Sequence, residues 1–459
     1  MKFRKTLLVA GLVLAAAPAM AAAQDDGEKS CFADFTPMTG DVGAGTLPES
    51  APYRVGSPSL SQMTIVARDP AQAKRFDSGD YDMHTANETG PDAGRYLFTV
   101  FETGQAGIQR TDLRTMQTTT IWSSPAAAPA LNSHVAFDAS RWTPWGSFLT
   151  AEESWNDPGQ PVSIYGRLFE VTNPLAAPAD IRMVHRSVIP RVSHEGLAFD
   201  KDRNLYFIDE RNGSFIFKYV PANPSATNGD HYFAAGQTFV LRVGDGLTKE
   251  ATGQATWVPL TNFNGAPLPG AVVVSDANGV SGIDGRATPR LAAFRGTGFD
   301  RPEDMEIKTY GDSGRQVLFV ATTTNHKVFA IDLSRNTVSL FVSRDTIDMA
   351  TGQPVGAAAF SNPDNLAIDA DGNIYVVEDQ PGGVEDIWFT VDRNGDGVAE
   401  AMGKWASLST VGAESTGLYF DRFRPDLAYV NVQHPDSGVD RTIMFLAPRT
   451  CRGNSQRGN

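Results

Sequence analysis

The chain has 459 residues, of which 41% are hydrophobic and 20% charged, and its formal net charge at pH 7 is −14. A surface of that sign repels nucleic acid and anionic lipid, and it suits a protein that collects divalent cations. The composition therefore argues against a nucleic-acid-binding function.

Residues 1–23 predict a cleaved export signal. Lys2, Arg4 and Lys5 precede an apolar run over residues 7–17, and small residues of the cleavage-site type follow it. The run is too short to span a bilayer, and no other apolar stretch approaches membrane length. We therefore expect an exported protein, periplasmic or secreted, without membrane insertion.

The two cysteines, Cys31 and Cys451, lie near the two ends of the mature chain. In an oxidising compartment we expect one disulfide that joins the termini, with two unpaired thiols as the alternative. In either case no cysteine remains inside the domain to act as a nucleophile or a soft metal ligand.

Residues 53–450 predict one domain, preceded by an N-terminal extension, 24–52, and followed by a C-terminal tail, 451–459. Short runs rich in Val, Ile, Phe and Tyr alternate with clusters of Gly, Asn, Asp and Pro, and helical spacing is hard to find. An all-β chain of this length without a linker favours a β-propeller, which is built by radial repetition of four-stranded sheets.

A repeated unit of strand, Asp-rich turn, strand and acidic pair supports the propeller. Residues 197–210 and 366–379 are the two clearest copies, and looser copies cover residues 328–336 and 418–431. The repeat favours six blades, with seven as the alternative. A disulfide between the termini fits a fold that closes by joining its first and last strands.

Acidic residues recur just before or just after the predicted strands. Equivalent positions of successive blades converge on a central channel, so acids far apart in sequence can form one cluster. They would repel one another unless cations sit between them, and the pattern therefore predicts a metal cluster. The candidate ligands are Glu153, Glu170, Glu195, Glu303, Asp364, Glu378, Asp379 and Glu414.

Several motifs between about residue 130 and residue 436 resemble, in the same order, those of the PhoX-type alkaline phosphatases. They are residues 142–153, 194–196, 299–303, 363–365, 377–379, 414–417 and 428–435. The resemblance implies a six-bladed propeller whose channel holds calcium and iron ions and hydrolyses phosphate monoesters. Such a protein would be an exported enzyme acting on small phosphorylated substrates, and we expect a monomer.

The resemblance also implies roles for single residues. Glu153 would face inward and its neighbour Glu152 outward, since adjacent side chains of a strand point to opposite faces. Arg301 would contact the phosphate as a forked, permanently charged clamp, and Glu303 would be essential for catalysis. The implied metal ligands are Glu153, Glu170, Glu195 and Glu303, with Asp364, Glu378 and Asp379 in a calcium-rich wall and Glu414 beside them.

The chain departs from the family at one position. PhoX-type enzymes place a cysteine, whose sulfur bridges two irons, five residues before the Thr of the Thr-Pro-Trp-Gly motif, and here that position is Asp138. A carboxylate can bridge two metals but is harder than a thiolate. Oxygen-only ligands suit Ca²⁺ and also Fe³⁺, so the cofactor could be calcium alone, calcium with iron, or another divalent ion.

Residues 392–400 predict a separate calcium-binding loop. Oxygen-bearing residues at loop positions 1, 3 and 5, a glycine at position 6 and an acid at position 9 match such a loop. Position 12 is Gly403, so the usual bidentate acid is missing, and a plain turn is the alternative. The loop ligands would come from Asp392, Asn394, Asp396, Val398 and Glu400.

The leading functional hypothesis is a metal-dependent phosphatase for small organic phosphates. Two alternatives stay open: a calcium-dependent lactonase or esterase built on a propeller, and a non-catalytic calcium-binding propeller. Arg301 favours the phosphatase, whereas the missing cysteine favours the alternatives.

Overall fold

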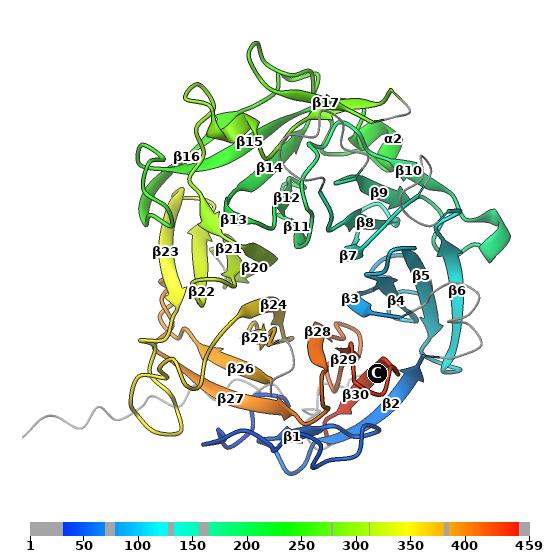
Figure 1. Ribbon diagram of the computed structural model, residues 1–459, viewed down its shortest axis with the longest axis vertical. Helices are drawn as coiled ribbons and strands as arrows, with labels where there is room; N and C mark the ends of the chain where they lie inside the picture. Colours follow the sequence, from blue (N-terminus) through cyan, green and yellow to red (C-terminus); the bar gives the residue numbers. More distant parts are fainter. Residues whose placement is uncertain are drawn as a thin grey trace, which may run out of the picture.

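The chain folds into a propeller-like ring of antiparallel sheets arranged around a common centre (Figure 1). The computed structural model describes residues 31–68, 79–126, 133–155, 165–276, 279–311, 313–380 and 385–448. Helix within these residues is limited to α2 (Gly229–Tyr232) and the 3-10 turns η1 (Pro178–Asp180) and η2 (Thr288–Arg290). The predicted all-β class is confirmed. Among the described residues, no helix is long and apolar enough to cross a membrane.

In two four-stranded sheets the strands are arranged in chain order, with the first strand innermost and the last strand outermost. The first comprises β3 (Tyr81–Ala86), β4 (Tyr96–Phe101), β5 (Gly107–Asp112) and β6 (Gln117–Ser123). The second comprises β7 (Phe137–Trp142), β8 (Phe148–Glu152), β9 (Leu168–Val171) and β10 (Met183–His185).

The next two groups of strands merge into one nine-stranded sheet because their outer strands, β16 and β23, pair with each other. One half contains β11 (Leu197–Phe199), β12 (Leu205–Ile208), β14 (Ile216–Pro221), β15 (Gly236–Val243) and β16 (Gly253–Pro259). The other half contains β20 (Pro302–Tyr310), β21 (Arg315–Thr322), β22 (Lys327–Asp332) and β23 (Thr337–Val342).

The N-terminal strands β1 (Tyr53–Val55) and β2 (Ser61–Ala67) complete the last two sheets. β1 adds to β24 (Pro363–Ile368), β25 (Ile374–Glu378), β26 (Asp386–Val391) and β27 (Ala401–Leu408). β2 adds to β28 (Glu414–Phe420), β29 (Leu427–Gln433) and β30 (Arg441–Leu446). The pairings of β1 with β27 and of β2 with β30 thus join the two ends of the domain.

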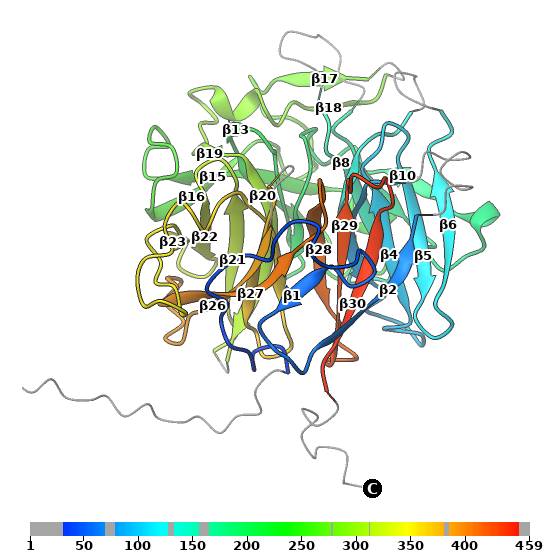
Figure 2. The ribbon, with the colours of Figure 1, turned by 60° about the horizontal axis from the view of Figure 1, so that its bottom comes forward.

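The inner strands β3, β7, β11, β20, β24 and β28 lie side by side around the channel, and β28 returns to β3 to close the ring (Figure 1). Two short ribbons, β13 (Asn212–Ser214) with β19 (Phe299–Asp300) and β17 (Val273–Ser275) with β18 (Ser281–Ile283), lie at one end of the ring (Figure 2). That end is where β19 leads into the predicted phosphate-binding Arg301.

The aspartates of the repeated unit hold hairpin turns. Asp200 Oδ1 accepts the N–H groups of Asp202 and Asn204 at 2.9 and 2.8 Å, and Asp369 makes the corresponding pair of bonds at 3.0 and 2.9 Å. Such side-chain bonds to the backbone two and four residues ahead fix a tight turn. These aspartates are therefore structural, and they explain why the repeat is visible in the sequence.

Aromatic side chains fill the space between the two sheets that the N-terminal strands complete. The Trp405 ring packs edge-on against Tyr375 and Phe445, and its Nε1 donates to the carbonyl of Phe32 at 3.0 Å. Cys31 packs against the same core, while Cys451 lies outside the described residues, so the predicted disulfide stays a prediction. The predicted export signal, residues 1–23, also lies outside them.

Candidate metal and phosphate site

Acidic residues occupy nearly the same position on every inner strand. Asp82, Asp138, Glu303 and Asp364 are the second residues of β3, β7, β20 and β24. Glu414 is the first residue of β28, and Glu195 comes two residues before β11. Because the inner strands form a ring, these positions converge on one end of the channel.

A β-bulge lies at most of these acids. On β7, Phe137 opposes Glu152 and Ser140 opposes Thr150, so one extra residue is inserted around Asp138. Corresponding register shifts occur on β3, β20 and β24, around Asp82, Glu303 and Asp364. A bulge bends the strand and re-aims a side chain, which here turns the carboxylates out of the ladder and into the channel.

A residue in the left-handed backbone region precedes five of the six acids by two positions. These residues are Asp80 (φ 46°), Ala136 (φ 43°), Arg301 (φ 51°), Asn362 (φ 45°) and Gly412 (φ 74°). Non-glycine residues seldom adopt this region, and clusters of them mark functional sites. The recurrence shows that the backbone bends in the same way where five of the inner strands begin.

A second set of acids comes from the ends of the neighbouring strands. The N–H groups of Glu102, Glu153 and Asp379 donate to the carbonyls of Asp80, Ala136 and Asn362 at 2.9, 2.8 and 2.8 Å, respectively. In an antiparallel hairpin the end of the second strand lies beside the start of the first. Each hairpin therefore delivers one acid from its start and another from its end.

These side chains line one cavity of about 180 Å³ at the mouth of the channel. Its lining is dominated by carboxylates, with Arg301 and His434 as the groups that can carry positive charge. The lining residues are Asp82, Glu102, Asp138, Glu153, Glu195, Arg301, Glu303, Asp364, Asp379, Glu414, Thr416, Gln433 and His434.

Two groups of three carboxylates are close enough to share a cation. Oxygens of Glu195, Glu303 and Asp364 all lie within 4.8 Å of one another. The second group, Asp379, Glu385 and Glu414, satisfies the same limit. Sequence reasoning missed Glu385, which is fully buried and accepts the N–H groups of Gln380 at 2.9 Å and of Ser415.

Burial raises the pKa values of several cavity carboxylates, and repulsion between neighbouring carboxylates adds to this effect. Burial raises the pKa of Glu303 to about 7, with Glu210 adding to the rise and Arg301 opposing it. The pKa values of Asp138, Glu195 and Asp364 are raised well above normal by burial and then by neighbouring carboxylates. Such a set holds its negative charge only when cations balance it.

Arg301 lies at the cavity mouth, with 37% of its side chain exposed. Its Nε is 2.7 Å from Oε1 of Glu210 and 3.1 Å from Oε1 of Glu303. Asp300 instead pairs with Lys249. The described residues provide no hydrogen-bond partner for the two terminal nitrogens of Arg301, so the forked end of the guanidinium is available to a ligand.

His434 forms another part of the mouth. Its Nδ1 lies 3.2 Å from Asp80 and its Nε2 lies 3.3 Å from Glu414. The hydrogen bond to Asp80 raises the pKa of His434, against the opposing effect of burial. Within the described residues, His434 and Arg301 are thus the two cationic groups around an acidic cavity.

The structure places two of the predicted ligands away from the cavity. Glu170 is buried in an ion pair with Arg186 at 2.5 Å and accepts the Trp145 Nε1–H at 2.8 Å. Glu378 is buried and does not line the cavity; its carboxylate accepts the N–H of Ser361 at 2.8 Å. Both carboxylates are occupied by partners from the chain itself.

Glu152 and Glu153 point in different directions, as expected. Glu153 lines the cavity, whereas Glu152 is fully buried and binds both ends of the Arg167 guanidinium, at 2.9 and 2.6 Å. Sequence reasoning placed Glu152 on the outside, but the side chain is part of an internal ion pair between β8 and the turn before β9.

Other lining residues were missed in the sequence: Asp82, Glu102, Gln433 and His434. Asp82 and Glu102 belong to the first hairpin of the domain, whose sequence does not carry the Asp-rich turn of the repeat. Their positions relative to the strands could have identified them. Asp82 lies near the start of one strand and Glu102 directly follows the next strand, and Asp138 and Glu153 have the same arrangement in the second sheet.

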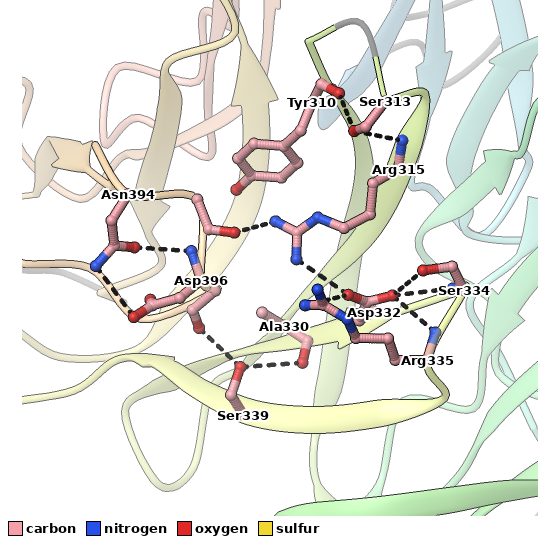
Figure 3. Close-up of polar contacts among 12 residues, drawn as sticks. Tyr310, Ser313, Arg315, Ala330, Asp332, Ser334, Arg335, Ser339, Asn394 and Asp396 are labelled. Carbon is pink, nitrogen blue, oxygen red and sulfur yellow. Dashed lines mark hydrogen bonds and ion pairs between the residues drawn. The ribbon is translucent and has the colours of Figure 1, made fainter.

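The predicted calcium loop joins β26 to β27 and packs against Arg315 and Ser339 of the neighbouring sheet (Figure 3), and none of its residues lines the cavity. Asn394 Oδ1 accepts the N–H of Asp396 at 2.8 Å, and Asp396 Oδ1 accepts the N–H of Val398 at 2.9 Å. Glu400 accepts the N–H of Arg393 at 2.9 Å, and Asp392 accepts the hydroxyl of Tyr310 at 2.6 Å. The loop oxygens are thus largely engaged within the chain, and Arg315 and Ser339 donate to its carbonyls at Gly395 and Gly397.

The family model for alkaline phosphatase PhoX matches residues 139–436. The chain belongs to the PhoX alkaline phosphatase family. Its enzymatic class is therefore that of the phosphoric ester hydrolases, and the resemblance seen in the sequence motifs is confirmed. The matched segment contains every cavity-lining residue except Asp82, Glu102 and Asp138, which precede it.

Among solved structures, the chain is similar to the PhoX of Pseudomonas fluorescens in complex with vanadate, a transition-state analogue. The identity is 16%, the TM-score is 0.58, and the match covers 89% of this chain and 97% of that one. An aldose sugar dehydrogenase from Streptomyces coelicolor matches with 12% identity and a TM-score of 0.41, covering 85% and 99% of the two chains. Regucalcin, a calcium-binding protein from Agrobacterium tumefaciens, matches with 10% identity and a TM-score of 0.39, covering 80% and 91%. No curated protein matches the chain.

Proposed function

We propose that the protein is an exported, metal-dependent phosphatase that hydrolyses small organic phosphate esters in the channel cavity. One observation carries this proposal. The same cavity is lined by Glu195, Glu303 and Asp364, by Asp379 and Glu414 of the second group, and by an arginine whose forked end is available. Carboxylates alone would repel a phosphate, whereas cations held between them would attract it. Arg301 then provides a fixed positive charge at the entrance.

The residues of the cavity fit a set of hard cations. Asp138 Oδ1, Glu195 Oε2 and Asp379 Oδ1 are buried and have no hydrogen-bond partner among the described residues. Buried carboxylate oxygens in that state are costly unless a cation binds them. We propose that Glu195, Glu303 and Asp364 hold one cation and that Asp379, Glu385 and Glu414 hold another, with Asp138 and Glu153 as further ligands.

Calcium is the cation that this ligand set favours, because all of the ligand atoms are carboxylate oxygens. Among the described residues that line the cavity none is a cysteine, so a sulfur bridge between two irons is absent there. Iron held by oxygen alone is the second possibility for part of the set. Cations bound here would polarise the phosphoryl group and activate a water-derived nucleophile.

The side chains of the chain itself would bind and orient the substrate. The free end of Arg301 would form two charge-assisted hydrogen bonds to phosphate oxygens, while Glu210 and Glu303 fix its Nε. His434 would balance charge at another part of the mouth while it is held between Asp80 and Glu414. The small volume of the cavity suits the phosphoryl group alone, so the organic part of the ester would stay outside.

Several finer features belong to the same proposal. We propose a six-bladed ring, because six inner strands each begin one group of strands around the channel. Export by residues 1–23, a periplasmic or secreted location, a Cys31–Cys451 disulfide and a monomeric state accompany it. A structural calcium ion in the 392–400 loop is a separate proposal, which rests on residue spacing alone.

The test is hydrolysis of an aryl phosphate by chelator-treated protein to which Ca²⁺, or Ca²⁺ with iron, has been returned. We expect turnover only after a cation is restored, and competitive inhibition by inorganic phosphate. Hydrolysis of a lactone under the same conditions, without hydrolysis of the phosphate, would instead favour the lactonase alternative.

A further inference from the structure

A closed belt of hydrogen bonds made by side chains runs around the channel and joins all of the inner strands. It borders the acidic cavity and shares Asp82 and Thr416 with the cavity lining. We call it the floor belt. Its side chains are Asp82 and Thr85 on β3, Arg141 on β7, Asp304 on β20, Asn365 on β24 and Thr416 on β28.

Arg141 spans more of the belt than any other member. Its Nε donates to the carbonyl of Leu197 on β11 at 2.5 Å, and its Nη2 donates to the carbonyl of Met305 on β20 at 3.3 Å. The same Nη2 forms an ion pair with Glu306 at 2.9 Å, and 18% of each side chain is exposed. One guanidinium thus ties three inner strands together.

The remaining bonds complete the circle. Asp304 Oδ2 accepts the N–H of Leu366 on β24 at 3.0 Å. Asn365 Oδ1 accepts the N–H of Gly417 on β28 at 2.5 Å, and the Thr416 hydroxyl donates to Asp82 Oδ1 at 2.6 Å, which joins β24, β28 and β3.

The last link leads from β3 back to β7. Thr85 Oγ1 accepts the N–H of Trp142, the neighbour of Arg141, at 3.2 Å. Side-chain networks of this kind are worth more than the sum of their bonds because each bond fixes the geometry of the next one.

Members of the belt are close neighbours in sequence of the proposed cation ligands. Asp304 follows Glu303, Asn365 follows Asp364, and Arg141 comes three residues after Asp138. The strands are closely packed at this level, because a Cβ atom added at Gly196 would lie 2.5 Å from the backbone nitrogen of Met305. A displacement of the belt would therefore move these ligands.

We propose that Arg141 is a positioning residue of the acidic cavity: by fixing β7, β11 and β20 to one another, it sets the spacing of Asp138, Glu195 and Glu303. This inference rests on the proposed binding of cations in the cavity. Arg141 does not line the cavity itself. Its side chain lines two hollows of about 330 and 260 Å³ on the far side of the belt, which it shares with Glu306 and Arg422.

Positioning and simple electrostatics predict opposite results when Arg141 is removed. Through space, a permanent cation near the carboxylates disfavours a second cation, so its loss alone would tighten calcium binding. If Arg141 sets the spacing of the ligands, its loss weakens calcium binding instead. Changes to groups that only orient a metal ligand lower metal affinity by about 10- to 100-fold.

The test is a calorimetric titration of Ca²⁺ into the chelator-treated full chain. We expect Arg141→Met to lower calcium affinity by about 10- to 100-fold, and Arg141→Lys, which keeps the charge and one donor, to lower it less. The matched control is Arg422→Met, since Arg422 lines the same hollows but is 62% exposed in its pair with Glu88. We expect the affinity of that control to stay within about twofold of the parent, as for other exposed pairs.

Unchanged or tighter calcium binding by folded Arg141→Met would overturn the inference. Should Arg141→Met fail to fold, Arg141→Lys replaces it, because it keeps the charge and loses the forked pair of bonds to the carbonyls of Leu197 and Met305. We expect that variant to lose calcium affinity to an intermediate extent, and an unchanged affinity would equally contradict the inference. A parent protein that binds no cation would refute the proposed function, independently of Arg141.

Discussion

Arg301 Nε lies 3.1 Å from Oε1 of Glu303, although the two residues are separated by only one position in the chain. The contact exists because Arg301 adopts a left-handed backbone conformation and a bulge follows at Glu303. Without these two local features, residues two apart on a strand would point the same way along the ladder rather than toward each other. A movement of Glu303, a proposed cation ligand, would therefore also move Arg301, the proposed phosphate clamp.

Arg301→Lys tests the clamp. Lysine keeps the charge but cannot form two parallel bonds to phosphate. We expect kcat/KM for an aryl phosphate to fall on the order of 10- to 100-fold, as for the loss of a charged hydrogen bond worth about 1.5–3 kcal/mol. Inhibition by inorganic phosphate should weaken in parallel, while calcium content stays unchanged. Equal phosphate inhibition in both proteins would remove Arg301 from the substrate site.

Glu303→Gln tests one of the proposed cation ligands of the cavity. The substitution preserves shape but removes a negative charge from the group formed with Glu195 and Asp364. We expect activity to fall at least about 100-fold, since changes to groups that merely orient a ligand already cost 10- to 100-fold in metal affinity. Asp300→Asn is the matched control, because Asp300 precedes the same strand but pairs with Lys249 outside the cavity. A similar loss in both variants would point to a general defect of this turn.

The neighbours Glu152 and Glu153 should respond in opposite ways to loss of charge. Glu152→Gln leaves Arg167 buried without its counter-ion and should lower the free energy of unfolding by about 3–5 kcal/mol. Glu153→Gln removes one of several mutually repelling carboxylates and should raise the stability of the chelator-treated protein. Urea unfolding in the presence of chelator measures both effects. A loss of stability in Glu153→Gln comparable to that in Glu152→Gln would contradict the division of roles.

The raised carboxyl pKa values predict how stability depends on pH. Burial raises the pKa values of Glu303 and Asp304 to about 7, so the metal-free native state binds protons that the unfolded chain releases above about pH 4–4.5. The stability that these protons confer is complete below that range and is lost as the pH rises through about 7. We expect the Tm of the metal-free protein to fall between pH 5 and pH 8.

Calcium should reverse that trend by taking the place of the protons. The rise in Tm on adding Ca²⁺ should consequently be larger at pH 8 than at pH 5. A calcium-dependent rise of equal size at both pH values would show that the bound cation does not compete with these carboxyl protons.

The fold and most of the site residues could be predicted because they follow simple periodic rules. The Asp-rich turns reveal the hairpins, and acids next to strands, such as Glu195 and Asp364, mark positions that a ring brings together. Glu170 and Glu378 obey the same local pattern, yet each lies against partners from its own surroundings. Glu170 and Glu378 differ from the proposed ligands in their contacts with Arg186 and with the backbone of Ser361, respectively, and neither contact is visible in the sequence.

Other features depend on geometry that one sequence does not reveal. The left-handed residues include Ala136 and Asn362, which carry no common sequence signal. The bond from Arg141 to Leu197 joins residues 56 positions apart. Glu385 directly precedes β26, which lies outside the repeated unit, so the repeat did not reveal it.

The cation content of the protein purified without chelator tests the central claim most directly. Elemental analysis of the parent chain should find more than one equivalent of bound cation, chiefly calcium. The double variant Glu195→Gln/Asp364→Asn, which neutralises two members of the central carboxylate group, should lose at least one equivalent. A parent chain without bound cations, or a double variant with the same content as the parent, would contradict the assignment of the channel cavity as a metal site.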